Sequence, residues 1–440
     1  MLKRKIENQL IAWKETKNKK PLILKGCRQC GKTYSVTKFA ESYYNHVVYI
    51  NFFENEAYKA VFSGSLEIDH IMMQMSALLN PSVGFIPGET VIILDEIQEC
   101  PQARTALKFF QMDGRFDVIG TGSLLGVKGY GTEPVSVPVG YETVIEMYPL
   151  DFEEFLWAVG IERRVIESLA ECLENVKQVP EAIHQKMRDL ILQYTVVGGM
   201  PEAVNCFIDT KQMNQVLQIQ RDIVRAYKED MVKYADKKDK VNIRECFESI
   251  PRQLAKDNKK FQYSAVKKGS KAAMYNGSLQ WVKDAGIIQF CRNLTITELP
   301  LDGNAEENVF KVYMQDTGLF VSMLEDGTQF DILQGNLYTY KGAIFENLVA
   351  DIFGKQGRQL YYFKKDSGLE LDFIMRYKGE CVPVEIKAVS GNAKSAKTVL
   401  KHPEKYHVQH IIKLGDYNIG NSTAGILTLP TYMAFLLKER

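Results

Sequence analysis

Gly26-Cys27-Arg28-Gln29-Cys30-Gly31-Lys32-Thr33 is the stretch that decides the fold of the N-terminal part of the chain. It follows the apolar run Leu22-Ile23-Leu24 and precedes a predicted helix over 34–44, which is the strand–loop–helix context of a phosphate loop. The glycines let backbone N–H groups point inward around phosphate oxygens, and the helix N-terminus faces the same anion. The pattern predicts that Lys32 reaches the β- and γ-phosphates of ATP and that the Thr33 hydroxyl binds Mg²⁺.

The predicted nucleotide-binding residues are the whole loop and the residue after it: Gly26, Cys27, Arg28, Gln29, Cys30, Gly31, Lys32, Thr33 and Tyr34. Cys27 and Cys30 also form a C-x-x-C, a spacing that fits a zinc or redox site. A metal there would occupy the space of the phosphate, and the sequence has no second cysteine pair nearby. The phosphate loop is therefore the favoured interpretation.

Composition indicates an ordinary soluble globular protein of more than one domain. The chain has 440 residues, of which 45% are hydrophobic and 25% charged, and its formal net charge is +1. A chain of this length is too long for one core, and so small a net charge gives no overall attraction to nucleic acid. The sequence contains no apolar stretch of the ~18–20 residues that span a membrane. The eight cysteines are scattered, which suits a reducing compartment, so we expect a cytoplasmic protein without a membrane partner.

Two further runs read as buried strands that end in polar residues. Residues 90–94 lead into Asp95 and Glu96, and residues 116–121 lead to Ser123. Strands alternating with helices predict an α/β fold with a parallel, RecA-like sheet, in which the carboxyl ends of the strands meet at one edge. Asp95 is then predicted to bind Mg²⁺ with Thr33, while Glu96 acts as general base and Ser123 lies near the γ-phosphate, with Lys32 completing the catalytic set. The alternative interpretation of Asp95-Glu96 is a solvated strand end.

ATP hydrolysis also requires stabilisation of negative charge, usually by an arginine. The sequence offers five candidates and does not choose among them: Arg104, Arg163, Arg164, Arg221 and Arg225.

The rest of the chain divides by its patterns. Residues 151 to about 234 have a helical pattern, interrupted at 198–201, and are predicted to form a lid over the nucleotide. Three short helices over 243–256, 263–268 and 271–285, followed by β-runs at 287–294 and 309–314, have the order of a winged helix. The predicted domains are an ATPase core (1–150), a helical lid (151–235), a winged helix (236–320) and an α/β domain similar to a nuclease (321–440).

The last domain carries a second group of carboxylates. The strands that contain Asp372 and Glu385 are predicted to form a hairpin through a turn at 377–380, which places these two residues opposite each other. Glu346 on the preceding helix and Lys387 can join them. Clustered carboxylates with a lysine are typical of restriction-type nucleases, so Glu346, Asp372, Glu385 and Lys387 form a candidate second metal site. The alternative is an exposed strand face that carries cross-strand ion pairs.

The middle of the chain is locally basic. Residues 237–271 contain eleven Lys or Arg and four Asp or Glu. If 271–285 is a groove-reading helix, its outward residues would include Tyr275 and Lys283, with Lys271, Asn276 and Gln280, and the partner would be DNA. The alternative is a solvated or intramolecular face.

Taken together, the motifs resemble a broad prokaryotic family of AAA-type ATPases with a C-terminal domain of unknown function that is similar to a restriction-type nuclease fold. The matching stretches are 26–33, 91–96, 148–155, 198–201, 316–319, 341–347, 370–373 and 385–387. The resemblance implies a RecA-like core, a winged helix and ATP binding. The chain departs from it at Tyr141, where relatives often carry a basic residue.

The sequence therefore predicts a Mg-ATP-dependent ATPase whose hydrolysis is coupled to its C-terminal half and which acts on or near DNA. The alternative is a signalling or regulatory ATPase whose C-terminal half binds a protein and has no nuclease activity. Either one is compatible with an oligomer.

Overall fold

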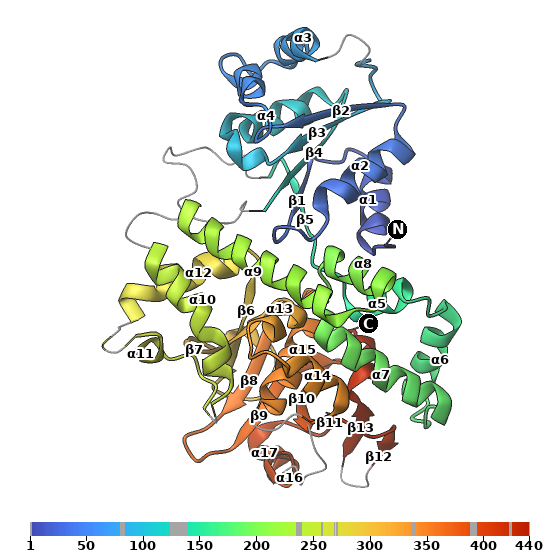
Figure 1. Ribbon diagram of the computed structural model, residues 1–440, viewed down its shortest axis with the longest axis vertical. Helices are drawn as coiled ribbons and strands as arrows, with labels where there is room; N and C mark the ends of the chain where they lie inside the picture. Colours follow the sequence, from blue (N-terminus) through green and yellow to red (C-terminus); the bar gives the residue numbers. More distant parts are fainter. Residues whose placement is uncertain are drawn as a thin grey trace.

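The computed structural model describes residues 2–79, 84–123, 140–234, 240–256, 258–267, 269, 272–336, 340–387, 394–421 and 425–439. Within these residues the strands form two sheets, one of five strands and one of eight. Figure 1 shows the smaller sheet in the upper half and the larger sheet in the lower half, with α8 (Pro201–Thr210) and α9 (Met213–Tyr234) near the boundary between them. None of the helices in the described part of the chain is both long and apolar enough to cross a membrane.

The smaller sheet has the strand order β2-β3-β4-β1-β5, and its neighbouring strands are parallel. Both faces are buried, since Ile92 and Leu94 of β3 belong to one core cluster and Val91 and Ile93 to another. A parallel strand covered on both faces has to be apolar at successive positions, which explains the unbroken run at 91–94. The predicted parallel α/β core is confirmed, but the edge strand β5 is not predicted from the sequence.

The elements of this part are α1 (Ile6–Glu15), β1 (Leu22–Lys25), α2 (Lys32–Tyr43), β2 (His46–Asn51), η1 (Glu56–Phe62), α3 (Ile68–Leu78), β3 (Thr90–Asp95), η2 (Ile97–Glu99), α4 (Pro101–Asp113), β4 (Asp117–Gly122) and β5 (Thr143–Glu146).

The helical segment that follows shares its hydrophobic core with the C-terminal half. Its helices are α5 (Phe152–Ala158), α6 (Arg163–Glu174), α7 (Glu181–Val197), α8 and α9. A single cluster of buried residues runs from Leu150 through these helices to Leu437. The segment expected as a lid therefore packs mainly against the C-terminal half, and only part of it reaches the phosphate loop.

The larger sheet is mixed, with the order β12-β13-β11-β10-β9-β8-β6-β7 among the described strands. The hairpin β6–β7, expected as a wing, is continuous with the rest because β6 pairs in parallel with β8, with Cys291 opposite Leu360. The expected boundary at 320/321 therefore falls between strands of one sheet.

The helices and strands of this C-terminal half are α10 (Lys240–Leu254), α11 (Tyr263–Val266), α12 (Ala272–Asp284), β6 (Ile288–Leu294), η3 (Asp302–Asn304), β7 (Ala305–Met314), α13 (Thr317–Ser322), α14 (Thr328–Gln334), α15 (Lys341–Lys355), β8 (Leu360–Lys364), β9 (Glu370–Tyr377), β10 (Glu380–Lys387), α16 (Lys394–Leu400), α17 (Pro403–Tyr406), β11 (Ile411–Gly415), β12 (Gly420–Asn421), β13 (Ile426–Pro430) and η4 (Thr431–Leu436).

A buried lysine joins the two halves. The Lys355 ammonium donates to the Leu150 carbonyl oxygen at 3.1 Å and to the Tyr194 hydroxyl at 3.0 Å. It also forms ion pairs with Asp351 at 2.7 Å and Asp316 at 3.3 Å. The side chain is fully buried, so each of these partners offsets part of the cost of burying its charge. This cluster fixes the end of the N-terminal part, at Leu150, against the helical segment and α15.

Candidate functional site

The phosphate loop has the backbone that its glycines require. A Cβ on Gly26 would lie 2.1 Å from the Met147 carbonyl oxygen, so a larger residue does not fit there. Gln29 and Gly31 have left-handed backbones, with φ of 64° and 96°. Left-handed residues interspersed in a turn make the concave row of N–H groups that binds anions. Gly31 precedes α2, so the positive end of that helix lies at the same loop.

Thr33 and Asp95 meet at the carboxyl edge of the sheet, where the Thr33 Oγ1 donates a 3.0 Å hydrogen bond to Asp95 Oδ2. The Tyr49 hydroxyl donates to the same oxygen at 2.7 Å, and the Thr121 hydroxyl donates to Oδ1. These donors fix the orientation of the carboxylate. A hydroxyl and a carboxylate oxygen in contact are ligands of the kind that Mg²⁺ prefers, so the pair fits a magnesium ion held together with a nucleotide.

The Lys32 side chain turns back into the loop. Its ammonium donates to the carbonyl oxygens of Gly26 and Cys27 at 3.0 and 2.8 Å, and the residue is only 7% exposed. Phosphate oxygens would attract this ammonium more strongly than neutral carbonyls do, since hydrogen bonds between charged groups are the stronger ones. Lys32 is therefore placed to move a short way from the loop carbonyls to a bound phosphate.

Glu96 follows Asp95 and has a left-handed backbone, with φ of 51°. Burial raises the pKa of the Glu96 carboxyl, while Gln98, Lys32 and Arg28 partly oppose that rise. Gln98 donates a hydrogen bond to this carboxylate. A carboxylate with a raised pKa accepts a proton more readily, which suits a general base.

The remaining predicted residues lie around the same edge. Ser123 is half-buried and follows Gly122, which pairs with Lys25 directly before the loop. Tyr34, in the first turn of α2, is 54% exposed. The structure thus brings together the loop, Asp95, Glu96 and Ser123, as their positions at strand ends indicate.

The structure also adds residues that the sequence did not indicate. Arg4, from the turn before α1, donates to the Cys30 carbonyl oxygen at 3.0 Å and forms an ion pair with Glu154 at 3.1 Å. From α9, the Tyr227 hydroxyl donates to the Arg28 carbonyl oxygen at 2.9 Å, and Asp230 pairs with the Arg28 guanidinium. The phosphate loop is therefore in direct contact with the helical segment.

The candidate arginines are engaged elsewhere. Arg104 pairs with Glu142 at 2.7 Å. The other four form ion pairs within the helical segment or with α13–α14: Arg163 with Glu167, Arg164 with Glu162, Arg221 with Asp326 and Arg225 with Asp222. None of these pairs, all between described residues, includes a residue of the phosphate loop.

The C-terminal hairpin has the expected register. Tyr377 pairs with Glu380 and Phe373 with Val384, so Asp372 lies next to Glu385. Leu371 and Phe373 are two residues apart on β9, yet they do not share one core face. A register shift between β8 and β9 places Leu371 in one buried cluster and Phe373 in another. Both faces of the sheet are covered, so that Glu346, Glu385 and Lys311 are buried, while Asp372 and Lys387 are partly exposed.

The Glu346 and Glu385 carboxylates form ion pairs and hydrogen bonds with neighbouring residues of the protein. Glu346, 2% exposed, accepts hydrogen bonds from Lys311 at 2.8 Å and Tyr313 at 2.5 Å and pairs with Lys259. Glu385 pairs with Lys387 at 2.8 Å. Nearby positive charge outweighs burial and lowers the pKa of Glu346 to about 2.

Asp372 differs from its neighbours, since its Oδ2 accepts the Ile386 amide at 2.8 Å. Burial and the Glu346 and Glu385 carboxylates raise the pKa of Asp372 to about 7, against the opposing charge of Lys311. Among the residues that the structure describes, no group of three His, Cys, Asp or Glu side chains is arranged to hold a metal ion.

The predicted groove-reading face of α12 differs from expectation. Tyr275, expected to point outward, is 1% exposed and its hydroxyl donates to Glu245 at 2.8 Å. The Lys283 ammonium packs 5.0 Å from the centre of the Phe290 ring. The aromatic and aliphatic parts of these side chains are needed for the packing of α12 on α10 and β6, which a helix pattern alone does not reveal. Lys271 and the side chain of Asn276 lie outside the described residues.

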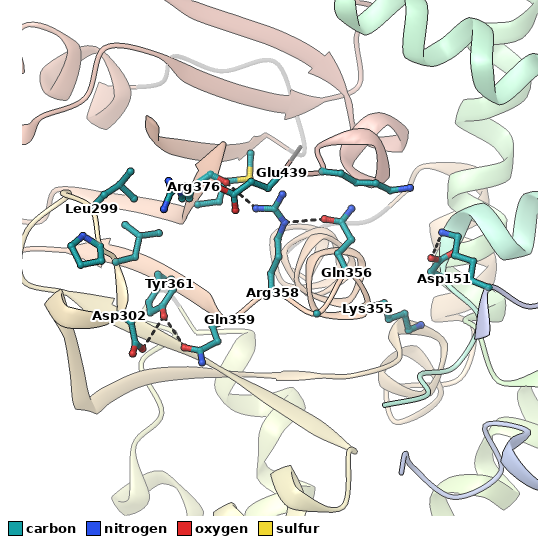
Figure 2. A pocket seen from close by; sticks show the side chains of 16 residues that line it. Asp151, Leu299, Asp302, Lys355, Gln356, Arg358, Gln359, Tyr361, Arg376 and Glu439 are labelled. Carbon is teal, nitrogen blue, oxygen red and sulfur yellow. Dashed lines mark hydrogen bonds and ion pairs between the residues drawn. The ribbon is translucent and has the colours of Figure 1, made fainter. Parts of the chain in front are cut away.

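Two hollows lie away from the phosphate loop. One, of about 760 Å³, has no loop residue in its lining. Figure 2 shows its walls, where Arg358 points to Gln356 and Tyr361 lies between Asp302 and Gln359. The second, of about 1140 Å³, lies between α9, α10 and α13–α14 and contains Arg221, Arg225, Lys228, Arg244 and Arg252. These cations contact carboxylates or backbone carbonyls of the protein.

Residues 18–156 match a family model described as an AAA domain. Residues 188–329 and 341–432 match two further models, each described as a domain of unknown function. A search of curated protein sequences found no significant match.

Several solved structures show a distant likeness. A Walker-type ATPase of Pyrococcus abyssi is 14% identical with a TM-score of 0.42, and the alignment covers 73% of this chain and 96% of that one. The Aeropyrum pernix ORC1 protein in complex with DNA is 12% identical with a TM-score of 0.29 (76% and 92% covered). The Thermotoga maritima RuvB branch migration motor is 16% identical with a TM-score of 0.30 (66% and 90% covered). The family match, together with the loop geometry, supports an AAA-type phosphate-loop ATPase domain over residues 18–156.

Proposed function

We propose that the protein is a Mg-ATP-dependent ATPase whose nucleotide state is transmitted to its C-terminal half. The observation that carries this proposal is the contact between Thr33 and Asp95. It joins the end of the phosphate loop to the end of β3, which β4 separates from β1 in the sheet, at the place where a nucleotide-bound magnesium ion needs oxygen ligands.

Each residue then has a distinct task. The loop amides and Lys32 bind the phosphates, and Thr33 with Asp95 holds the Mg²⁺ that neutralises phosphate charge. Glu96 accepts a proton from the attacking water, and its raised pKa suits that role. Ser123, beside the start of the loop, contacts the γ-phosphate.

The contacts of the loop with the rest of the chain support the coupling. Asp230 and Tyr227 of α9 contact Arg28, and α9 belongs to the core shared with the C-terminal sheet. A nucleotide that reorders the loop would act on these contacts and so on α9. The coupling thus needs no contact between ATP and the larger sheet.

We further propose that the C-terminal half acts in regulation or signalling through a protein partner, and that its carboxylates do not cut DNA. The ion pairs of Glu346 and Glu385 with lysines support this proposal, because they use the oxygens that a metal would need. The inward position of Tyr275 likewise argues against DNA reading by α12.

Steady-state ATP hydrolysis by the wild type and by Glu96→Gln tests the proposal, with ATP affinity measured in both. We expect the variant to bind ATP and to hydrolyse it on the order of 10²-fold more slowly, since the amide keeps the size of the side chain and loses its basicity. Glu89→Gln, at an exposed residue before β3, is the matched control and should behave as the wild type. Equal turnover of Glu96→Gln and wild type would remove Glu96 from the mechanism.

A further inference from the structure

Two thiols lie inside the phosphate loop. Cys27 and Cys30 are 4% and 0% exposed. Both belong to one buried cluster, and Cys30 Sγ lies 3.5 Å from the Met147 carbonyl oxygen. Their spacing of three residues within one turn and their burial in the same cluster suit a disulfide, which needs two side chains that can approach each other without a large backbone movement.

The surroundings favour a thiolate at Cys30. The Cys30 residue directly precedes Gly31 at the N-terminus of α2. The hydrogen bond from Cys27, together with the Lys32 and Arg4 cations, lowers the pKa of the Cys30 thiol in spite of its burial. In contrast, the pKa of Cys27 is raised. One thiolate beside one neutral thiol at a helix N-terminus is the arrangement found in dithiol redox sites.

We propose that Cys27 and Cys30 form a reversible disulfide that switches the phosphate loop off. The oxidant is a low-molecular-weight disulfide. The Cys30 thiolate attacks one of its sulfurs, the S–S bond of the oxidant breaks, and one small thiolate leaves. Cys27, deprotonated, then attacks the Cys30 sulfur of the mixed disulfide and releases the second small thiolate. The protein loses two electrons and two protons, which end on the two small thiols.

Oxidation requires the loop to open. The Tyr227 hydroxyl covers one side through its bond to the Arg28 carbonyl oxygen, and Gly286 lies against Cys27, since a Cβ on Gly286 would be 3.2 Å from the Cys27 nitrogen. A small oxidant reaches the sulfurs when these contacts separate. A bound nucleotide would hold the loop closed and slow the reaction.

The effect on ATP rests on the proposed function. The amides of residues 27–31 have to face the phosphates, and Lys32 has to leave the carbonyl oxygens of Gly26 and Cys27. A cross-link between Cys27 and Cys30 closes the loop on itself and prevents this rearrangement. We expect oxidation to weaken ATP binding at least tenfold.

The test treats the reduced full-length protein with oxidised glutathione, then follows its mass, its disulfide map and its ATP affinity. We expect the wild type to lose the mass of two hydrogen atoms, with the cross-link at Cys27–Cys30, and to regain ATP binding after reduction. Cys27→Ser should stop at a mixed disulfide on Cys30. Cys206→Ser, outside the loop, should behave as the wild type.

The outcomes separate the two proposals. Failure to form the Cys27–Cys30 cross-link, or unchanged ATP affinity once it has formed, overturns the switch. If the reduced protein already fails to bind ATP, the proposed function is wrong, while the mass and the disulfide map still decide whether the cross-link forms.

Discussion

Replacing Asp372 by Asn should stabilise the protein at pH 8 and have little effect at pH 4. In the folded protein the pKa of Asp372 is about 7, whereas its ordinary value is 3.8. Because the pKa of Asp372 is higher in the folded state than in the unfolded state, the folded state binds the proton more tightly. Proton binding therefore stabilises the folded state, and this stabilisation is complete below about pH 4. It is lost as the pH rises through 7, where the partly buried carboxyl has to ionise beside Glu346 and Glu385.

The size of the effect follows from the same values. Each pKa unit corresponds to about 1.4 kcal/mol, so a rise of about three units sets an upper limit on the order of 4 kcal/mol. Since the neighbouring charges of Glu346, Glu385 and Lys311 can rearrange when Asp372 ionises, we expect a smaller change of roughly 1–3 kcal/mol in the free energy of unfolding. The amide oxygen of Asn can still accept the Ile386 N–H, now at 2.8 Å, so the backbone contact is retained.

Urea unfolding of the full-length protein at pH 4 and pH 8, without divalent cations, measures this difference. Asp366→Asn is the matched control, because Asp366 is exposed in the turn between β8 and β9. Equal effects of Asp372→Asn at the two pH values would refute the reasoning. So would a loss of stability at pH 8, which would indicate that the ionised carboxylate is favourably paired.

Two further predictions concern the core and the partner. Lys355→Met should destabilise the protein by about 3–5 kcal/mol in urea unfolding, because Asp316 and Asp351 would keep buried charges without their cation; a loss below about 1 kcal/mol would show that this cluster does not join the halves. Duplex DNA should leave the rate of ATP hydrolysis unchanged between about 50 and 200 mM salt. Stimulation that falls steeply over this range would favour a DNA-acting ATPase instead of a regulatory one.

Local patterns were sufficient to predict the elements around the nucleotide. The loop at 26–33 and the apolar run before Asp95 each carry their signal within about ten residues, and the strand ends of a parallel sheet have to meet at one edge. The hairpin register was predictable for the same reason, because the turn at 377–380 fixes it.

Contacts between distant segments were not predictable. Nothing near Tyr227 in the sequence indicates that it contacts Arg28, and nothing near Arg4 indicates its bond to the Cys30 carbonyl. The burial of the Glu346 and Lys311 charges could not be predicted for a related reason. Alternation along β9 indicates two faces but does not show that Lys311 and α15 cover the second one.

The central claim is that the loop at 26–33 binds the phosphates of ATP through Lys32. Equilibrium binding of Mg-ATP to the wild type, Lys32→Ala and Lys38→Ala tests it most directly, since Lys38 lies on the same helix and is about one-third exposed. A charge-assisted hydrogen bond contributes about 1.5–3 kcal/mol, so Lys32→Ala should weaken binding by roughly 10–100-fold, while Lys38→Ala binds as the wild type does. Wild-type affinity in Lys32→Ala would contradict the account.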